Sequence, residues 1–326
     1  MSATFDDVKA AARRLDGITI RTPLLENARV NDRLGGRLFI KAECLQRTGS
    51  FKLRGAYNFL ASMSEADRKK GAVGWSSGNH AQGLAEAARL MKMKATIVMP
   101  ADAPALKVAN TRASGAEVVL YDRVKESREE IGMGIARRTG ATVVPPYDHP
   151  WILTGQGTAG LEIVEQAKAL GVTLDAVAAP CSGGGLSTGI ALAVKGLSPT
   201  TSVHAGEPAG FDDLARSLKS GKKEKNAKLS GSICDALLAP EPGDVTFPLA
   251  KQLLGPGLVV SDDEVLDAME TAFREFKLVV EPGGAVALAA ALAGKLPVKD
   301  RAVAVVCSGG NVDHATFERA LRRSTA

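Results

Sequence analysis

The segment LDAVAAPCSGGGLSTGIALAVKGL, residues 174–197, contains a short apolar run, a glycine turn and a longer apolar stretch. Its first run, residues 174–180, is nearly continuous in apolar residues rather than alternating, which is typical of a parallel strand buried on both faces. Three consecutive glycines, Gly183 to Gly185, follow and lead into a helical pattern. A strand, a glycine turn and a helix in this order predict an α/β fold with a parallel sheet.

The same alternation recurs along the chain and predicts the domain organisation. Further strands are expected at residues 94–100, 116–122, 141–146, 202–208, 257–261 and 302–307. Helical patterns lie between them, and several end at glycine. The chain has 326 residues, more than one hydrophobic core normally serves. We therefore predict two α/β domains, each an open, mostly parallel twisted sheet flanked by helices. Residues 1–45 and 149–326 would form the large domain, and residues 46–148 the small one.

Composition limits the classes of function. Aromatic residues make up only 4% of the chain, and the basic residues behind the net charge of +5 are scattered, which argues against a nucleic-acid partner. No apolar run approaches the roughly 18 residues of a membrane span, and the acidic, amphipathic N-terminal helix is unlike a signal peptide. The cysteines form no CxxC pair, which favours reduced thiols in a cytoplasmic protein.

The glycine turn is a candidate phosphate site. Backbone N–H groups of consecutive glycines can converge on an anion, and the start of a helix adds partial positive charge. Ser182 or Ser187 could donate a further hydrogen bond. The spacing matches neither G-x-x-x-x-G-K-[ST] nor G-x-G-x-x-G, so a single phosphate monoester is favoured over a nucleotide. The alternative is a tight turn that needs glycine only for packing.

Two other segments supply polar groups at strand ends. The segment SSGNHAQG, residues 76–83, offers the side chains of Ser76, Ser77, Asn79 and His80, which suit a carboxylate or a ring hydroxyl oxygen. Its alternative is a turn in which Ser76 or Asn79 caps a helix. Ser308 follows the strand at residues 302–307, so it should point into the crevice where α/β sheets bind ligands, unless it only forms a β-turn.

The segment SFKLRGAYN, residues 50–58, places Lys52 among apolar neighbours. Alone it could be a salt-bridged lysine. A desolvated lysine, however, has a lowered pKa and can form a Schiff base with a carbonyl compound. A phosphate site together with such a lysine indicates pyridoxal 5′-phosphate. The predicted substrate is consequently a small molecule with an amino group.

Helix capping is a candidate role for acidic residues in two segments. Glu281 in EPGGA, residues 281–285, is expected to cap the first turn of a helix. Glu207 and Asp213 in GEPAGFDD, residues 206–213, could bind Mg²⁺ or Ca²⁺. Helix capping by Asp212 and Asp213 is the alternative there.

Six segments in this order and separation identify a resemblance: SFKLRGAYN, SSGNHAQG, GQGTAGLEI, CSGGGLSTG, GEPAGFDD and CSGGNVD. Over nearly the whole chain they resemble the serine/threonine dehydratase group of fold-type II pyridoxal-phosphate enzymes, which includes threonine ammonia-lyase and serine racemase. The resemblance implies that Lys52 carries the cofactor, that Phe51 lies beside its ring, that Asn79 bonds the ring hydroxyl oxygen and that Ser308 faces the ring nitrogen. It places the phosphate on the N–H groups of Gly183, Gly184, Gly185 and Leu186. It places the substrate carboxylate on Ser76, Ser77, Asn79 and His80. It matches a divalent-cation site to Glu207, the Phe211 carbonyl and Asp213.

The activity implied is dehydration of a β-hydroxy L-amino acid, such as threonine or serine, to a 2-oxo acid and ammonia by a homodimer. A serine at the ring nitrogen, unlike a carboxylate, would not keep it cationic, which favours elimination over reprotonation. Ser77 matches the acid/base of the racemase, so amino-acid racemisation is the alternative. Trp75, Ala236 and the glycine pair at residues 283–284 depart from the pattern. They leave threonine, serine, 3-hydroxyaspartate and 3-phenylserine open as substrates.

Overall fold

The computed structural model describes residues 3–76, 78–103 and 105–325. The strands are β1 (Leu24–Glu26), β2 (Arg37–Lys41), β3 (Ala72–Trp75), β4 (Ala95–Pro100), β5 (Glu117–Tyr121), β6 (Thr142–Val143), β7 (Ala176–Pro180), β8 (Ser202–Pro208), β9 (Leu258–Val260) and β10 (Ala302–Val306). The α-helices are α1 (Phe5–Leu15), α2 (Ala28–Leu34), α3 (Lys52–Ser62), α4 (Glu65–Lys70), α5 (Asn79–Leu90), α6 (Ala105–Ala113), α7 (Arg128–Thr139), α8 (Pro150–Ala169), α9 (Gly185–Leu197), α10 (Asp213–Ser220), α11 (Thr246–Leu253), α12 (Asp262–Phe276), α13 (Pro282–Leu292) and α14 (His314–Leu321). Short 3₁₀ turns are η1 (Glu43–Leu45), η2 (Asp235–Leu237) and η3 (Arg322–Thr325).

The larger sheet has the strand order β1-β2-β10-β7-β8-β9. β1 runs antiparallel to β2, and the other neighbouring strands pair in parallel. Successive residues of β10 pack on opposite faces: Val303 and Val305 join the core with α12 and α13, whereas Ala304 and Val306 join the core with α8 and α9. Helices therefore cover both faces, which explains why the parallel strands are apolar throughout.

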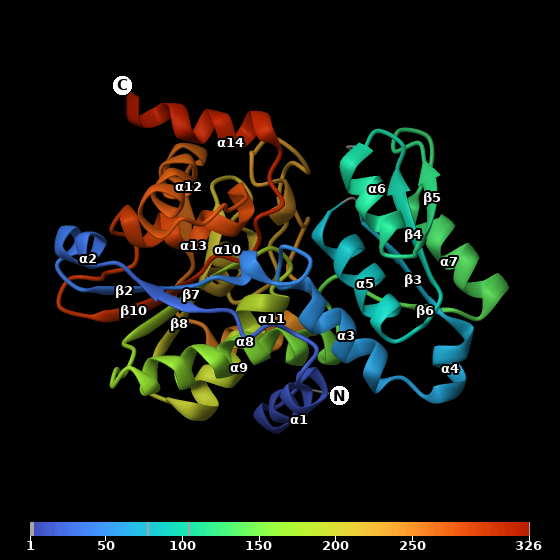
Figure 1. Cartoon of the computed structure of the whole chain (residues 1–326), viewed down its shortest axis with the longest axis horizontal. Coiled ribbons are helices and arrows are strands. Elements are labelled where there is room, and N and C mark those ends of the chain that lie inside the picture. Colours follow the sequence, from blue (N-terminus) through green and yellow to red (C-terminus); the bar gives the residue numbers. More distant parts are fainter. Residues whose placement is uncertain (1–2, 77, 104, 326) are drawn as a thin grey trace.

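The smaller sheet has the order β5-β4-β3-β6, with all neighbours parallel. Ile97 and Met99 of β4 pack on one face with the core residues of α3 and α5, and Val98 packs on the other face with Ile135 of α7. We call the part built on this sheet the smaller lobe and the part built on the six-stranded sheet the larger lobe. Figure 1 shows the two lobes side by side, with α3 between them.

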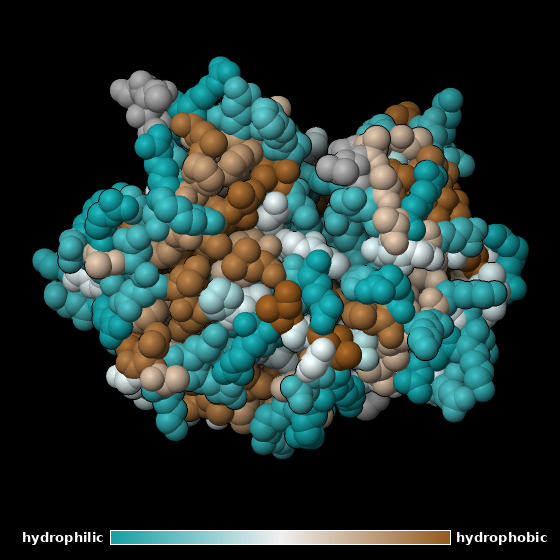
Figure 2. Space-filling model, viewed as in Figure 1, coloured by the Kyte–Doolittle hydropathy of each residue, from teal (hydrophilic) through white to brown (hydrophobic). Residues whose placement is uncertain are grey.

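The α/β class and the two mostly parallel sheets agree with the sequence prediction. The boundaries after residues 45 and 148 stay a prediction, because α3 contacts both α5 of the smaller lobe and α8 of the larger one. Within the residues that the structure describes, no helix is long and apolar enough to cross a membrane. Figure 2 shows apolar residues gathered on the larger lobe around α12 and α13.

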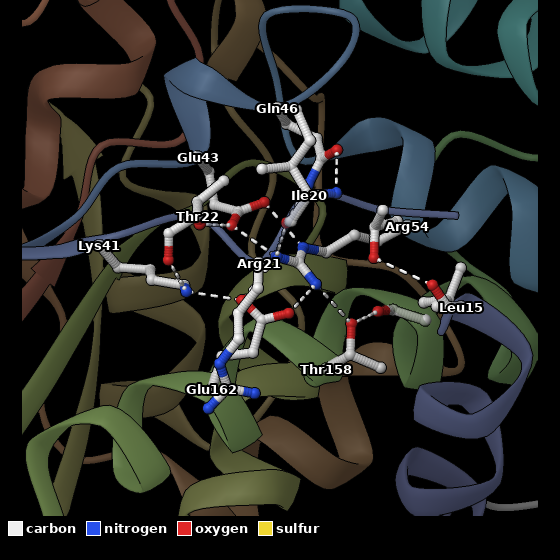
Figure 3. Close-up of polar contacts among 12 residues, drawn as sticks. Leu15, Ile20, Arg21, Thr22, Lys41, Glu43, Gln46, Arg54, Thr158 and Glu162 are labelled. Carbon is white, nitrogen blue, oxygen red and sulfur yellow. Dashed lines mark hydrogen bonds and ion pairs between the residues drawn. The ribbon is translucent and has the colours of Figure 1, made fainter. Parts of the chain in front are cut away.

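A group of buried charged side chains ties α3 to the larger lobe (Figure 3). Arg54 is fully buried and donates to both oxygens of Glu43 at 2.8 Å and to both oxygens of Glu162 at 2.7 and 2.9 Å. Lys41 donates to the same Glu162 at 2.6 Å. The two cations balance the two carboxylates, and either kind alone would be costly to bury. Because Glu43 follows β2 and Glu162 lies in α8, these contacts hold the helix that begins with Lys52 against the larger lobe.

Candidate active site

A cavity of about 540 Å³ lies between the lobes and collects most of the predicted residues. It is lined from α3, from the start of α5, from the glycine turn before α9 and from the end of β10. The predicted residues at its wall are Phe51, Lys52, Ser76, Asn79, His80, Gly183, Gly184, Gly185, Leu186 and Ser308. It lies where parallel strands of both sheets end, which is the usual position of ligand sites in α/β proteins.

Lys52 is the first residue of α3 and reaches the cavity with its amine. Nζ donates to the Pro146 carbonyl at 2.8 Å and lies 5.2 Å from the centre of the Phe51 ring. Burial lowers the pKa of Lys52 to about 8, and the Glu281 carboxylate opposes that shift. The amine is thus neutral in a larger fraction of molecules than an ordinary surface lysine, which makes it a better nucleophile and base.

The glycine turn has the geometry of an anion cradle. Gly184 has φ +94°, in the left-handed region that favours glycine, and α9 begins at the next residue. A Cβ at Gly183 would lie 2.0 Å from a ring carbon of Tyr147, so the close packing there requires glycine. The first N–H groups of α9 lack partners inside the helix and can receive a phosphate. Thr188, in the same first turn, has a buried hydroxyl without a hydrogen-bond partner among the described residues.

Asn79 begins α5 and is held from two sides. Its Nδ2 donates to the carboxylate of Glu281, and its Oδ1 accepts from Asn311 at 2.7 Å. Glu281 was expected to cap α13, but its side chain instead contacts Asn79 across the cavity wall. This part of the site was missed because the contact joins residues 202 positions apart in the chain.

The remaining residues of the SSGNHAQG segment are placed differently from one another. Ser76 Oγ accepts from the Gly78 N–H at 3.2 Å, so it shapes the turn rather than capping α5. His80 is buried with Nε2 3.0 Å from the Val144 carbonyl, and burial lowers its pKa to about 3. Its imidazole is therefore neutral, and an anion would meet its backbone N–H at the start of α5 rather than a charge. Ser77, the predicted acid/base, lies outside the described residues.

Ser308 directly follows β10 and is nearly buried, at 4% exposure. Its carbonyl accepts from the Phe51 N–H at 3.1 Å, so the lysine segment and the end of β10 lie side by side. Ser308 lines the same cavity as Lys52 and the glycine turn.

The predicted cation residues lie around the start of α10, and none of them is among the residues that line this cavity. Glu207 accepts from the N–H groups of Leu214 and Ala215 at 3.0 and 2.7 Å, so Glu207 caps α10 rather than Asp212. Asp213 is buried, and one of its oxygens has no hydrogen-bond partner within the described residues. Burial raises the pKa of Asp213 to about 6 and, with the charge of Asp213 added, raises that of Glu207 well above its usual value. No cluster of three or more His, Cys, Asp or Glu arranged for a metal occurs in the described chain.

Two further cations, Lys107 and Arg128, line the cavity and were not predicted. Lys107 is in α6, with Nζ 3.7 Å from an oxygen of Asp235. Arg128 begins α7 and pairs with the neighbouring Glu129 at 2.8 Å. Both come from the smaller lobe and line the same cavity as the glycine turn of the larger lobe.

A glycine cradle for a phosphate, a partly buried lysine of lowered pKa and a serine at a strand end define a cofactor-dependent α/β enzyme. The residues present fit pyridoxal 5′-phosphate, since cradle and lysine share one cavity. The chain belongs to the family described as pyridoxal-phosphate dependent enzyme, which matches residues 15–308.

Individual relatives agree with this assignment. The chain is 43% identical over 320 residues to L-threo-3-hydroxyaspartate ammonia-lyase of a Pseudomonas species, covering 98% of this chain and 99% of the relative. It is 39% identical to serine racemase of Schizosaccharomyces pombe, covering 95% of this chain and 94% of the relative. The crystal structure of a threonine deaminase from T.th. superposes with a TM-score of 0.89 at 43% identity, covering 95% of this chain and 99% of that one. The fold is that of fold-type II pyridoxal-phosphate enzymes, as the sequence predicted.

Proposed function

We propose that this protein is a pyridoxal 5′-phosphate-dependent dehydratase that converts a β-hydroxy L-amino acid, such as threonine or serine, to a 2-oxo acid and ammonia. The observation that carries the proposal is Lys52, whose amine of lowered pKa shares one cavity with the glycine turn. The relatives named as ammonia-lyases, each covered along nearly its full length, support the same reaction type.

Within this proposal Lys52 has two tasks. Its amine would hold the cofactor in the resting enzyme, and the same amine would act as the general base for the substrate α-proton. When bound, pyridoxal 5′-phosphate supplies an aldehyde for the amino group and an electron-withdrawing ring that stabilises negative charge at the α-carbon. The Pro146 carbonyl, 2.8 Å from Nζ, keeps the amine at the cavity wall.

The other predicted residues would bind and orient. The N–H groups of Gly183, Gly184, Gly185 and Leu186 would hold the phosphate, with Phe51 beside the ring and Ser308 at its nitrogen. Ser76, Ser77 and the start of α5 at Asn79 and His80 would receive the substrate carboxylate. Ser77 would also be the acid/base of any racemisation.

The test is a panel of L-threonine, L-serine, the 3-hydroxyaspartate isomers and 3-phenylserine, with release of 2-oxo acid as the readout. Rapid release from at least one compound is expected. Chiral analysis of the L-serine reaction separates the alternative, because fast formation of D-serine with little pyruvate would identify a racemase instead.

A specific observation favours 3-hydroxyaspartate as a second candidate substrate. Lys107 and Arg128 line the cavity, and a cation there can bind a second carboxylate that serine and threonine lack. Replacing Arg128 by Gln should raise KM for 3-hydroxyaspartate roughly tenfold while leaving KM for serine within about twofold. Arg123→Gln is the matched control, since Arg123 pairs with Asp102 at 3.0 Å outside the cavity. Equal effects of the two variants would exclude this role of Arg128.

The divalent-cation site is also a proposal. Glu207, the Phe211 carbonyl and Asp213 are oxygen donors of the kind that Mg²⁺ and Ca²⁺ prefer. The unpartnered oxygen of Asp213 supports binding there, whereas the capping role of Glu207 competes with it. A chelator should lower thermal stability if a cation is bound, and the absence of any effect would favour capping alone.

We further propose that the protein is a cytoplasmic homodimer. Phe273, in α12, and Val279, just after it, are 39% and 44% exposed, and exposed apolar groups of this kind often mark an interface. All four cysteines are buried and free, which suits a reducing compartment. Light scattering after size-exclusion chromatography tests the homodimer, and cell fractionation tests the cytoplasmic location.

A further inference from the structure

Asn79 belongs to the smaller lobe, but the residues that hold its side chain belong to the larger one. Glu281 precedes α13, and Asn311 follows β10. Both segments are themselves fixed, because the Glu281 N–H donates to the Gly309 carbonyl at 2.9 Å. The three side chains thus form a chain of hydrogen bonds across the cavity wall.

The orientation of the Asn79 amide follows from its two partners. A carboxylate accepts hydrogen bonds, so the Asn79 atom next to ionised Glu281 must be the nitrogen. Asn311 donates one N–H to the Thr48 carbonyl at 2.9 Å and the other to Asn79 Oδ1 at 2.7 Å. One N–H of Asn79 is therefore used by Glu281, its oxygen is used by Asn311, and its second N–H is left to donate elsewhere.

We propose that Glu281 is a positioning residue that, together with Asn311, fixes the Asn79 amide so that its second N–H is presented to the cofactor. The inference rests on the proposed contact of Asn79 with the ring hydroxyl oxygen. A donor fixed before the cofactor arrives loses little conformational freedom on binding, so the gain should appear in cofactor affinity.

Charges around Glu281 make this contact sensitive to pH. Burial raises the pKa of Glu281 to about 7; the hydrogen bond from Asn79 and the Lys107 ammonium oppose the shift, and the Asp235 carboxylate adds to it. The Lys52 amine of α3 and the thiols of Cys44 and Cys234 also interact electrostatically with Glu281. Above about pH 7 the ionised carboxylate accepts strongly from Asn79, and below it the neutral acid accepts more weakly.

The experiment compares the holoenzyme with Glu281→Gln by two measurements that need no substrate. The first is the visible absorption of bound pyridoxal 5′-phosphate titrated from about pH 5.5 to 9, and the second is the cofactor Kd. The wild-type spectrum should change with a midpoint near pH 7, where Glu281 titrates. Glu281→Gln should lose that midpoint and bind the cofactor about tenfold more weakly.

Two charge variants are the matched controls, because they alter the field at Glu281 without touching Asn79. Asp235→Asn should move the midpoint to lower pH and Lys107→Gln to higher pH, since these residues raise and lower the pKa of Glu281 respectively. A merely structural role of Glu281 predicts neither shift. If Glu281→Gln fails to fold, Asn311→Ala replaces it and should weaken cofactor binding to a similar degree.

The proposal is overturned if Glu281→Gln keeps the midpoint and a Kd within about twofold of wild type, or if Asn311→Ala leaves the Kd unchanged. Both readouts use the cofactor alone. A protein that releases no 2-oxo acid would therefore refute the proposed function and leave the positioning role of Glu281 to be decided by the spectrum and the Kd.

Discussion

Arg54→Met should destabilise the protein far more than the loss of a surface ion pair. Arg54 and Glu43 are both fully buried, and the guanidinium also contacts Glu162. At about 4 Å and an effective dielectric constant of about 20, each guanidinium–carboxylate attraction amounts to about 4 kcal/mol. Methionine replaces the volume but not the charge, so two carboxylates would face the single cation of Lys41. Stranded buried charges of this kind cost about 3–5 kcal/mol.

The loss should depend on pH with a definite sign. In the wild type, burial is the largest single influence on Glu43 and raises its pKa, but the charge and hydrogen bonds of Arg54, with smaller effects of Lys41 and Thr22, together hold the pKa below its usual value. This carboxylate therefore stabilises the fold above the unfolded-state pKa. Without Arg54, burial is opposed only by the smaller effects of Lys41 and Thr22, so the folded-state pKa of Glu43 should rise. The variant would then lose stability as pH rises, and the free-energy gap to wild type should be larger at pH 8 than at pH 5.

The assay is urea unfolding of the cofactor-saturated protein, followed by tryptophan fluorescence at both pH values. Arg37→Met is the matched control, because Arg37 makes the same two-pronged contact with Glu26 at 2.7 and 2.8 Å but is half exposed. It should cost less than about 1 kcal/mol. Combining Arg54→Met with Glu43→Gln restores charge balance, so the double variant should recover about 2 kcal/mol relative to the sum of the single effects. Equal costs for Arg54→Met and Arg37→Met would refute the reasoning.

Three further outcomes are expected. Lys52→Ala should abolish 2-oxo acid release and leave the circular dichroism spectrum unchanged; continued elimination would remove Lys52 from the mechanism. Gly183→Ala should weaken cofactor binding at least tenfold by pushing a methyl group into Tyr147, whereas Gly134→Ala, with its nearest neighbour 3.7 Å away on an open helix face, should be neutral or slightly stabilising. Asp213→Asn should stabilise the cation-free protein by about 2–3 kcal/mol at pH 8 and not at pH 4. The reason is that a carboxylate whose folded-state pKa is raised to about 6 lowers the stability only as pH rises through that range. Added Mg²⁺ should stabilise only the wild type, and an equal response of both proteins would exclude the cation site.

The sequence predicts the sheets well where the chain repeats one local pattern. The expected strand at residues 174–180 is β7, Ala176–Pro180, and the one at residues 302–307 is β10, Ala302–Val306. Both are apolar because helices cover them on two sides. β1 and β2 were not predicted. β2 reads RLFIK, with Arg37 and Lys41 at its ends. Lys41 is buried with its amine donating to Glu162 of α8 at 2.6 Å, to Gln166 and to the Thr22 carbonyl. A strand that depends on a partner 121 residues later carries no local signal.

The residues of the site also divide into those with a local sequence signal and those whose role depends on distant parts of the chain. Glycines, a lysine among apolar residues and a serine after a strand are readable because each feature is contained in a few consecutive residues. Glu281 was misjudged as a cap because its position at a helix start is local, whereas its contact with Asn79 depends on how the two lobes pack. Lys107 and Arg128 were missed for the same reason, since both are ordinary helix residues until the lobes place them at one cavity.

The short crossing at residues 145–148 shows how much of the site depends on one segment of the chain. It leads from β6 of the smaller lobe to α8 of the larger lobe. The Pro146 carbonyl holds the Lys52 amine, the Tyr147 ring packs on Gly183, and Asp148 accepts from the N–H groups at residues 244–246. A shift of either lobe would therefore move the support of the lysine and the packing of the phosphate cradle together. Because Pro146 and Tyr147 are consecutive, covalent geometry fixes the spacing between the carbonyl that holds the amine and the ring that packs on the cradle. This spacing should change less than the position of Asn79 when the lobes move.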